Sequence, residues 1–389
     1  MTAKNPKIWS PILAGCCATL LGIGLQRFAY GPILPAMVEE GWLAAAPAGM
    51  LGAANLAGYL VGAFTAGMVA RAFGVVWALR LSMIAAVIGF ALCAIDGGFF
   101  WFLPWRILAG LTGGVLMVLA GPSVQSVVAP EKRNLASGLV ITGVGLGIIV
   151  SSLLVPAILP LGLTATWLAL ALVALFLTLL TWRIWPDVPA PKPATRSGPP
   201  LPNGGRMMLT IYGFAGFAGT AHMVFWPDFV ARGLGLGTEA GAFSWLVYGV
   251  AAALGGVIFS RLADWFGAGH AITFALAIQA ASLILPLLWT SPLALGISGA
   301  GAGVTVLGIT ALGLVRSREL GGDGASRLWR LATAIWGVTT AVAGFLLSAL
   351  LAMTDSHLPM FVVGLTAALI ALALACWPKG QRFSVSNSG

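Results

Sequence analysis

Apolar residues occur along this chain in long runs, and short polar segments separate one run from the next. About 20 apolar residues of helix cross a hydrocarbon core of about 30 Å, and such a segment must satisfy its backbone hydrogen bonds internally. Each run therefore predicts a membrane-spanning α-helix. Twelve are expected, near residues 11–37, 44–69, 79–98, 101–129, 135–159, 164–185, 208–231, 240–262, 269–290, 292–315, 331–353 and 357–377.

The composition supports a membrane protein and excludes a soluble one. Of the 389 residues, 59% are hydrophobic and 8% are charged, whereas soluble domains carry about 25% charged residues. So few charges cannot cover a soluble particle of this size. The four cysteines lie inside apolar runs and lack the spacing of metal ligands, so we expect no metal site and no cofactor. They are Cys16, Cys17, Cys93 and Cys376.

The net charge of +9 lies in the short connectors between runs, which argues against a nucleic-acid partner. Cytoplasmic loops of membrane proteins are rich in Lys and Arg. With the N-terminus inside, 17 of the 20 Lys and Arg residues are cytoplasmic, so both termini are predicted to be cytoplasmic. A lipobox-like sequence ends at Cys16, but the apolar run before it is short and continues beyond it, which favours a membrane span.

The longest polar interruption divides the chain. Residues 186–206 contain seven prolines and only four apolar side chains, a composition typical of an extended, solvated linker. Six spans precede this segment and six follow it. We therefore expect an N-terminal half over 1–185, a cytoplasmic linker over 186–206, and a C-terminal half over 207–389 that includes a short cytoplasmic tail.

The two halves repeat each other. Positions of span 1 recur in span 7 at an offset of 195, and positions of span 2 and its following loop recur at an offset of 193. The matches are Gly24, Arg27 and Pro32 with Gly219, His222 and Pro227, and Asn55, Gly62 and Gly74 with Tyr248, Gly255 and Gly267. Repeats of this kind are common in transporters, with the substrate between them. The predicted fold is an all-α membrane protein, with twelve helices in two pseudo-symmetric six-helix halves.

Several short motifs resemble those of the major facilitator superfamily. Residues 260–267 (SRLADWFG) resemble its loop motif G-x-L-a-D-r-x-G, and residues 67–74 form the first-half counterpart. Residues 106–113 resemble the span-4 motif R-x-x-x-G-x-G, and residues 130–134 (PEKRN) resemble the P-E-x-R-g connector. The segment 22–35 is similar to span 1 of the bacterial YbfB/YjiJ-type branch.

This resemblance implies a secondary active transporter in a bacterial inner membrane, and not an enzyme. Two halves would rock about a central site that spans 1, 4, 7 and 10 surround, so that the site opens alternately to each side. No nucleophile–base pair stands out in the sequence to suggest catalysis. The expected partners are a small-molecule substrate, the lipid bilayer and, as an option, protons, and the expected working unit is a monomer.

Arg27 is the first candidate for substrate binding. It lies deep in span 1, and no Asp or Glu lies in the middle of any span. A charge there costs about 2.5–3.5 kcal/mol on insertion scales, so an unpaired guanidinium favours an anionic ligand. The alternative is that Arg27 bonds helix carbonyls or the Asn55 amide. His222 is expected to face the same cavity from the other half, or else to be an ordinary core histidine.

The other predicted substrate contacts are amide and aromatic side chains. Asn55 and Tyr59 are spaced i,i+4, and Trp245 and Tyr248 are spaced i,i+3, so each pair shares one helix face. The same side chains also suit packing between helices, and both interpretations remain open. With Arg27 and His222, the full predicted set is Asn55, Tyr59, Tyr248, Trp245, Trp226 and Tyr30.

Five charged residues are predicted to act in coupling or gating. Asp228, at the outer end of span 7, is the best carboxylate for proton coupling, with an interfacial acid as the alternative. Arg106 lies near the end of span 4 and is expected to snorkel to the outer face. The remaining three, expected at the cytoplasmic gate, are Asp264, Arg133 and Arg71.

The cytoplasmic gate is expected to be asymmetric. The resemblance places Asp264 against the start of span 5, where it would pair with Arg133 and with the positive helix terminus. Arg71 stands where the superfamily motif has an acid. It would instead face the segment 327–330 of the other half, unless Asp323 intervenes.

The preferred function is transport of a small organic solute, which the unpaired Arg27 suggests is anionic. Two alternatives stay open. One is export of amphipathic drugs through an apolar cavity that contains Trp226, Trp245 and Trp336. The other is a membrane sensor that keeps the fold but carries no solute.

Overall fold

The computed structural model describes residues 8–190 and 201–376. Their regular structure is helical, with three short 3-10 turns, η2 (Pro130–Lys132), η3 (Leu159–Leu161) and η5 (Gly322–Gly324). Residues 191–200 of the predicted linker lie outside the described residues. The longer elements are α1 (Trp9–Thr19), η1 (Leu20–Leu25), α2 (Gln26–Phe28), α3 (Tyr30–Glu39), α4 (Ala45–Phe73), α5 (Val75–Leu92), α6 (Gly98–Val127), α7 (Arg133–Ile158), α8 (Leu163–Thr181), α9 (Gly205–Asp228), η4 (Phe229–Gly233), α10 (Thr238–Leu288), α11 (Pro292–Gly321), α12 (Ala325–Thr354) and α13 (Leu358–Cys376).

Eleven helices of the described part are long and apolar enough to cross a membrane. One of them, α10, has 51 residues, which is about 75 Å of helix and enough for two crossings. Its backbone leaves helical geometry at Gly267, with φ 77° and ψ 151°. The all-α membrane fold is thus confirmed, and the predicted spans 240–262 and 269–290 are the two helical segments of α10 on either side of Gly267.

The bend at Gly267 belongs to the internal repeat. Gly74, which lies 193 residues earlier, has φ 79° and ψ 154° and separates α4 from α5. A residue with a Cβ rarely adopts these angles, whereas glycine adopts them readily. The same backbone turn therefore follows the second span of each half.

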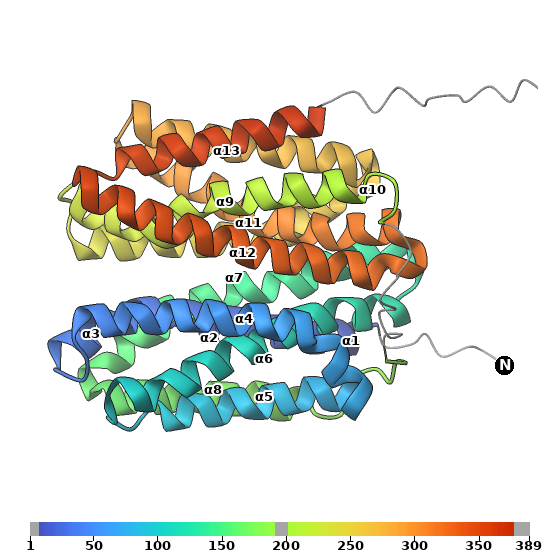
Figure 1. Ribbon diagram of the computed structural model, residues 1–389, viewed down its shortest axis with the longest axis horizontal. Helices are drawn as coiled ribbons and strands as arrows, with labels where there is room; N and C mark the ends of the chain where they lie inside the picture. Colours follow the sequence, from blue (N-terminus) through green and yellow to red (C-terminus); the bar gives the residue numbers. More distant parts are fainter. Residues whose placement is uncertain (1–7, 191–200, 377–389) are drawn as a thin grey trace, which may run out of the picture.

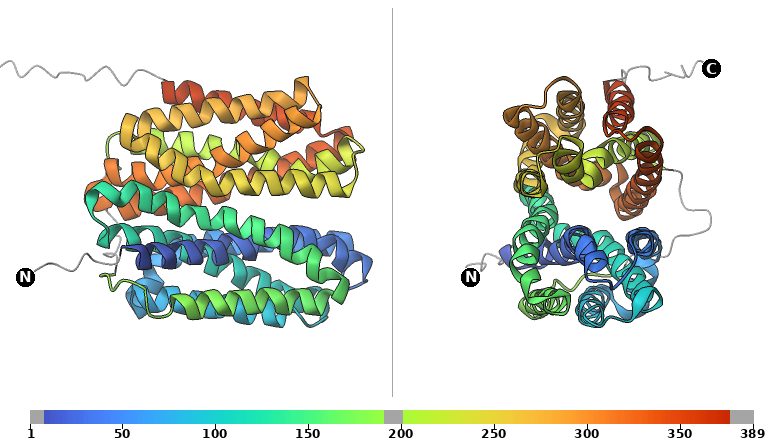
Figure 2. Two further views of the ribbon diagram at one scale, coloured as in Figure 1. Left: turned by 180° about the vertical axis from the view of Figure 1, so that it is seen from behind. Right: turned by 90° about the vertical axis from the view of Figure 1, so that its left-hand side faces the viewer.

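The helices form two groups that lie side by side along their length (Figure 1). One group contains α1 to α8 and the other contains α9 to α13, and the end-on view in Figure 2 shows them as two separate bundles. Between the groups, α7 packs on α10 and α11, and α4 packs on α12.

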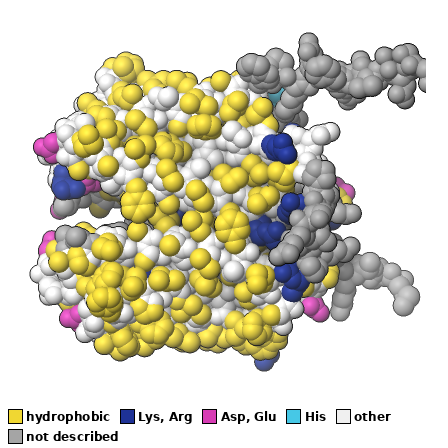
Figure 3. Space-filling model, viewed as in Figure 1, with side chains coloured by type: hydrophobic (Ala, Val, Ile, Leu, Met, Phe, Trp, Pro, Cys, Tyr) yellow, Lys and Arg dark blue, Asp and Glu magenta, His cyan; other side chains and the backbone are white. Residues whose placement is uncertain are grey.

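Most Lys and Arg side chains gather at one end of the bundle. This basic end contains Arg71, Lys132, Arg133, Arg318 and Arg330, at the ends of α4 and α11 and the starts of α7 and α12. Figure 3 shows it at the right of the molecule. Both ends of the described chain, residues 8 and 376, also lie there (Figure 1).

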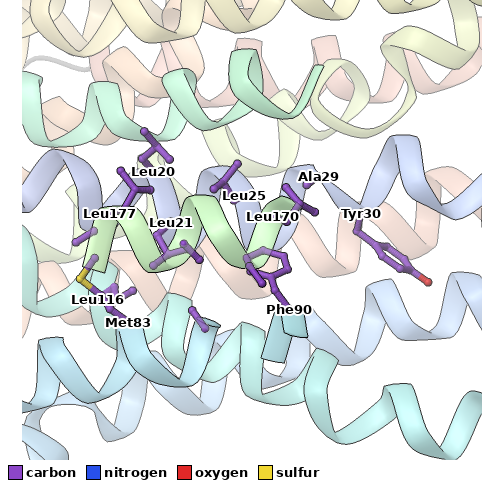
Figure 4. Packing of buried hydrophobic residues seen from close by; sticks show 14 of the residues in the cluster. Leu20, Leu21, Leu25, Ala29, Tyr30, Met83, Phe90, Leu116, Leu170 and Leu177 are labelled. Carbon is purple, nitrogen blue, oxygen red and sulfur yellow. The ribbon is translucent and has the colours of Figure 1, made fainter. Parts of the chain in front are cut away.

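Each half has its own apolar core. In the first half, Leu20 and Leu21 of η1 pack with Phe90, Leu116 and Leu170 from three other helices (Figure 4). In the second half, aromatic side chains of α9, η4 and α13 form a separate cluster. These cores make each half a packed unit, while the surface between the halves is shared.

Glycines let helices within each half meet at their backbones. An added Cβ on any of four glycines would overlap a backbone carbonyl oxygen of the neighbouring helix, so these glycines are sterically required. The pairs in the second half lie 193 residues after those in the first. They are Gly62 with Leu111, Gly110 with Asn55, Gly255 with Val304, and Gly303 with Tyr248. The sequence repeat is therefore also a repeat of helix contacts.

We predict that Gly110→Ala lowers stability, because the new methyl group must push α4 and α6 apart. Overpacking of this kind costs about 1–3 kcal/mol. Gly89→Ala is the matched control, since nothing lies within 4 Å of its added Cβ. The melting temperature in detergent should fall for Gly110→Ala and should stay level or rise for Gly89→Ala. Equal melting temperatures would contradict this packing.

Candidate functional site

A cavity lies between the two halves near the middle of the bundle. Its volume is about 40 Å³, room for a few water molecules. Both halves line it, through spans 1, 2, 4 and 5 and through spans 7, 10 and 11. The lining residues are Ile23, Arg27, Phe28, Tyr59, Met117, Val144, Tyr212, Met223, Val306, Leu307, Thr310, Thr333 and Trp336. Figure 3 shows the molecule hollowed between the halves at the end opposite the basic end.

Arg27 reaches this cavity because of an irregular turn in span 1. The helix is π-helical over η1 (Leu20–Leu25), a local widening that is frequent at functional sites. Within η1, Gly24 lies against the backbone of Gly147 on α7. This contact holds span 1 against α7, the helix that also packs on α10 and α11 of the second half. The next turn of span 1 carries Arg27 to the cavity. We call the surface between the two halves the seam.

The Arg27 guanidinium has no hydrogen bond or ion pair within the described residues. Its carbon lies 5.6 Å from the centroid of the Phe28 ring. Tyr59 and Tyr248 are near enough to interact with its charge. The alternative that Arg27 bonds a carbonyl or the Asn55 amide is therefore not what the structure shows.

Aromatic side chains continue from Arg27 into the second half. Phe28 lies 6.0 Å from Trp245, and Trp245 stacks on Tyr248 at 4.7 Å with an angle of 11° between the rings. On the facing wall, Tyr212 lies 4.8 Å from Trp336. Of the predicted contacts, Tyr59 lines the cavity, whereas Trp245 and Tyr248 lie beside it.

Two buried hydroxyl groups, one lining the cavity and one beside it, also lack partners. The Tyr248 hydroxyl and the Thr333 Oγ1 are buried and make no hydrogen bond within the described residues. Burying a hydroxyl without a partner costs free energy. Thr333 lines the cavity together with Arg27, so its hydroxyl and the guanidinium are donors that a polar ligand group there is able to satisfy.

His222 and Trp226 are not in this cavity, so the expectation that His222 faces Arg27 is wrong. His222 is buried, and its Nε2 lies 2.9 Å from Ser298 Oγ, which donates its own proton to the Ser282 carbonyl. The centroid of its ring lies 4.7 Å from that of the Trp226 ring, with the two rings tilted by 36°, and 5.3 Å from that of the Phe361 ring. His222 is thus a satisfied core histidine, because span 7 turns this face into its own half.

Arg106 does not extend to the outer membrane face, so the expectation that it snorkels there is wrong. Its side chain is 2% exposed, its Nη1 donates to the Gln26 carbonyl at 3.1 Å, and its guanidinium carbon lies 4.1 Å from the Tyr30 ring centroid. Tyr30 donates to the Ala48 carbonyl at 2.7 Å. The Asn55 amide donates to the Arg106 carbonyl at 3.3 Å.

Arg106, Tyr30 and Asn55 therefore join spans 1, 2 and 4 inside the first half, away from the cavity. The reason is local. The helix of span 1 is interrupted at Ala29, between α2 and α3, and the Gln26 carbonyl bonds the arginine there. Tyr30 and Asn55 are packing residues here, which is one of the two interpretations that the sequence left open.

Asp228 lies at the end of α9 and is paired within the second half. It bonds Arg232 one turn later, and His357 Nε2 lies 2.8 Å from its Oδ2. The Asp228 side chain is 26% exposed. This environment matches the alternative of an interfacial acid.

Asp264 pairs with the start of α7, but with the residue after the predicted one. Asn134 donates to Asp264 Oδ1 at 2.7 Å, and Arg318 donates to Asn134 Oδ1 at 2.5 Å. Arg133 turns away and donates to the Val128 carbonyl at 3.1 Å. We call Asp264, Asn134 and Arg318 the polar latch, since they join α10 and α11 to α7 at the basic end.

Arg71 lies on the other side of the seam at the same end. The Nη1 atoms of Arg71 and Arg330 flank Gly67, at 3.4 and 3.3 Å from the position of an added Cβ. Arg71 thus faces the 327–330 segment, as expected. The side chain of Asp323 lies outside the described residues.

Some residues of the site were not predicted from the sequence. Tyr212, Thr310 and Thr333 line the cavity, and Asn134 forms the polar latch. Tyr212 had a signal, because only four tyrosines occur in the chain and the other three, Tyr30, Tyr59 and Tyr248, were all predicted substrate contacts. A threonine or asparagine on an apolar helix carries no such signal. The described residues contain no group of three or more side chains that would hold a metal ion.

Two solved structures resemble nearly the whole chain. The human organic anion transporter MFSD10 (TETRAN) matches with a TM-score of 0.77 and 16% identity, over 95% of this chain and 100% of its own. A bacterial homologue of the iron transporter ferroportin, in an outward-facing state, matches with a TM-score of 0.71 and 16% identity, over 95% and 98%. At this identity, both matches show the fold alone. No curated protein sequence matches.

A family profile covers most of the sequence. The profile described as "Uncharacterised MFS-type transporter YbfB" matches residues 19–376, which include all the cavity-lining residues. This result agrees with the fold match and with the resemblance of the loop motifs. The chain therefore belongs to the YbfB family of major facilitator superfamily transporters, and it is a transporter rather than an enzyme.

Proposed function

We propose that this transporter moves a small organic anion with an apolar or aromatic body. The observation that carries the proposal is the Arg27 guanidinium, which faces the cavity and has no partner within the described residues. A carboxylate accepts two parallel hydrogen bonds from one guanidinium. The Thr333 hydroxyl, which lines the same cavity, is a further donor. Phe28, Met117 and Trp336 supply an apolar wall for the rest of the solute. One structural neighbour is described as an organic anion transporter, which supports testing this class.

Transport is proposed to occur by alternating access in a bacterial inner membrane, with the chain working as a monomer. The excess of Lys and Arg at the basic end supports a cytoplasmic location for that end and for both termini. The halves 1–185 and 207–389 would move as units, joined by the linker 186–206. Since the cavity holds only a few water molecules, an organic solute requires the halves to separate.

Proton coupling through Asp228 stays a prediction. Its pairing with His357 joins two titratable groups, a combination able to exchange a proton with solvent at that end. The pair does not line the cavity, so any coupling would have to act through movement of α9 and α13.

Export of amphipathic drugs is the second candidate, and the apolar lining favours it. Trp336 lines the cavity, whereas Trp226 is buried in the second half and Trp245 lies beside the cavity. A neutral or cationic drug would use the wall without Arg27. A sensor that binds the anion without moving it is the third candidate, and flux measurements in liposomes separate it from a transporter.

We predict that aromatic carboxylates such as benzoate raise the melting temperature of the purified protein through Arg27. Hydrogen bonds to charged groups are worth about 1.5–3 kcal/mol, so Arg27→Gln should weaken binding at least about tenfold. Thermal shift titrations measure this affinity. Uptake of labelled benzoate into liposomes should fall in parallel.

Two variants serve as controls for this experiment. Arg183→Gln removes an exposed positive charge outside the cavity and should leave binding unchanged. Arg27→Lys keeps the charge but loses the two-pronged geometry, so it should retain only part of the affinity. If Arg27→Gln binds benzoate as well as wild type, or if only cations and neutral drugs bind, the anionic substrate must be abandoned.

We also predict that the polar latch holds the basic end closed. Asn134→Ala removes both bonds of the latch and should lower the closed-to-open ratio at least about tenfold, since each bond involves a charged partner. Spin labels at Glu131→Cys and Ser326→Cys, exposed positions on opposite halves, report this ratio by double electron–electron resonance. The exposed Cys376 is first replaced by serine.

Arg133→Gln is the control for the latch, because Arg133 bonds a carbonyl of its own half and should change the ratio less than about twofold. Asp264→Asn should loosen the end more than Arg71→Ala does, since Asp264 bonds across the seam and Arg71 has no such bond within the described residues. A larger effect from Arg133→Gln than from Asn134→Ala would restore the pairing expected from sequence.

A further inference from the structure

The basic end has two sides that the internal repeat relates, and their charges differ. Arg71 and Asp264 are 193 residues apart, the offset that also relates Gly74 to Gly267 and the glycine contacts of the two halves. On the Asp264 side, the carboxylate joins the halves through Asn134. On the Arg71 side, the equivalent position carries the opposite charge, and the facing residue is Arg330.

Arg71 of α4 and Arg330 of α12 therefore bring two positive groups together from opposite halves. Their Nη1 atoms flank Gly67, where the absent side chain leaves space between α4 and α12. Arg330 is half-buried and experiences the charges of both Arg71 and Arg327. Neither Arg71 nor Arg330 has a hydrogen bond or ion pair within the described residues. Two like charges at this separation repel each other, so by themselves they favour an open seam.

We propose that Arg71 and Arg330 form a binding site for a phosphate-type oxyanion that bridges the two halves and holds the basic end closed. Guanidinium groups bind phosphate with two parallel hydrogen bonds each, and one phosphate has enough oxygens for both arginines. This bridge would be the counterpart of the polar latch, with the bound oxyanion in the role that the Asp264 carboxylate has there. Neither arginine lines the central cavity, so this site is separate from the substrate site.

Two sources supply such an oxyanion at this position. The basic end lies at the surface of the membrane-spanning bundle, where an anionic phospholipid headgroup is within reach, and inorganic phosphate is available from solution. Both offer the same phosphate oxygens to the arginines. The experiment below therefore has one arm for each source.

The test measures the spin-label distance between Glu131→Cys and Ser326→Cys in three preparations. These are phosphatidylcholine nanodiscs, the same nanodiscs with inorganic phosphate, and nanodiscs that contain phosphatidylglycerol. We expect phosphate or phosphatidylglycerol to raise the closed-to-open ratio at least about tenfold. An effect of phosphatidylglycerol alone identifies a lipid headgroup, and an effect of phosphate alone identifies a soluble anion.

Variants separate this site from general charge effects. Arg71→Gln and Arg330→Gln should remove the response to the anion, whereas Arg183→Gln, which removes an exposed charge outside the seam, should keep it. Arg71→Asp places an acid opposite Arg330, as on the Asp264 side, and should close the seam without any anion. If Arg71 served only in packing, Arg71→Asp would not be expected to close the seam.

The melting temperature gives a second readout that does not depend on the spin labels. Phosphate or phosphatidylglycerol should raise it for wild type and Arg183→Gln, and not for Arg71→Gln. The proposal is overturned if neither anion changes the distance or the melting temperature, or if Arg71→Gln responds as wild type does. Because no substrate is used, this outcome is independent of the test of Arg27.

Discussion

Helices in a bilayer gain little from burying apolar side chains against each other, because lipid tails are equally apolar, so close packing must hold them together. In this protein the close packing extends across the seam between the halves. Gly138 lies against Gly256, and Gly145 lies against Ala253, so the backbones of α7 and α10 touch where these two helices cross. This contact sets the position of the cavity, of span 1 beside α7, and of the polar latch.

Two arginines lie inside the membrane-spanning bundle with different results. Arg106 finds a carbonyl and an aromatic ring within the first half, and so it contributes to the packing of spans 1 and 4. Arg27 projects into the cavity, where the described lining of the second half consists of Tyr212, two threonines, Trp336 and apolar side chains, with no acid among them.

The internal repeat preserves the backbone turns and helix contacts of the two halves, whereas the side chains at matching positions differ. Gly74 and Gly267 have the same turn, and the pairs of helices before them meet at equivalent glycines. The side chains on this common frame differ, with Asp264 where Arg71 stands and with His222 where Arg27 stands. At the basic end the frame is shared, so Arg71 and Asp264 fall at equivalent places and give the two sides of the seam distinct electrostatic properties. Arg27 and His222 do not, because Arg27 faces the cavity and His222 is buried in its own half.

The family profile and the helical architecture agree with what the sequence alone indicated, since long apolar runs and their charged connectors are local features. The depth of Arg27 and the absence of acids from the middle of the spans were equally visible. The directions in which His222, Arg106 and Asn134 point were not. Whether a side chain on an apolar helix faces the seam, its own half or lipid depends on which helices surround it, and that is decided by packing. Sequence therefore determined which groups are costly to bury, and the tertiary structure alone decided which of them found a partner.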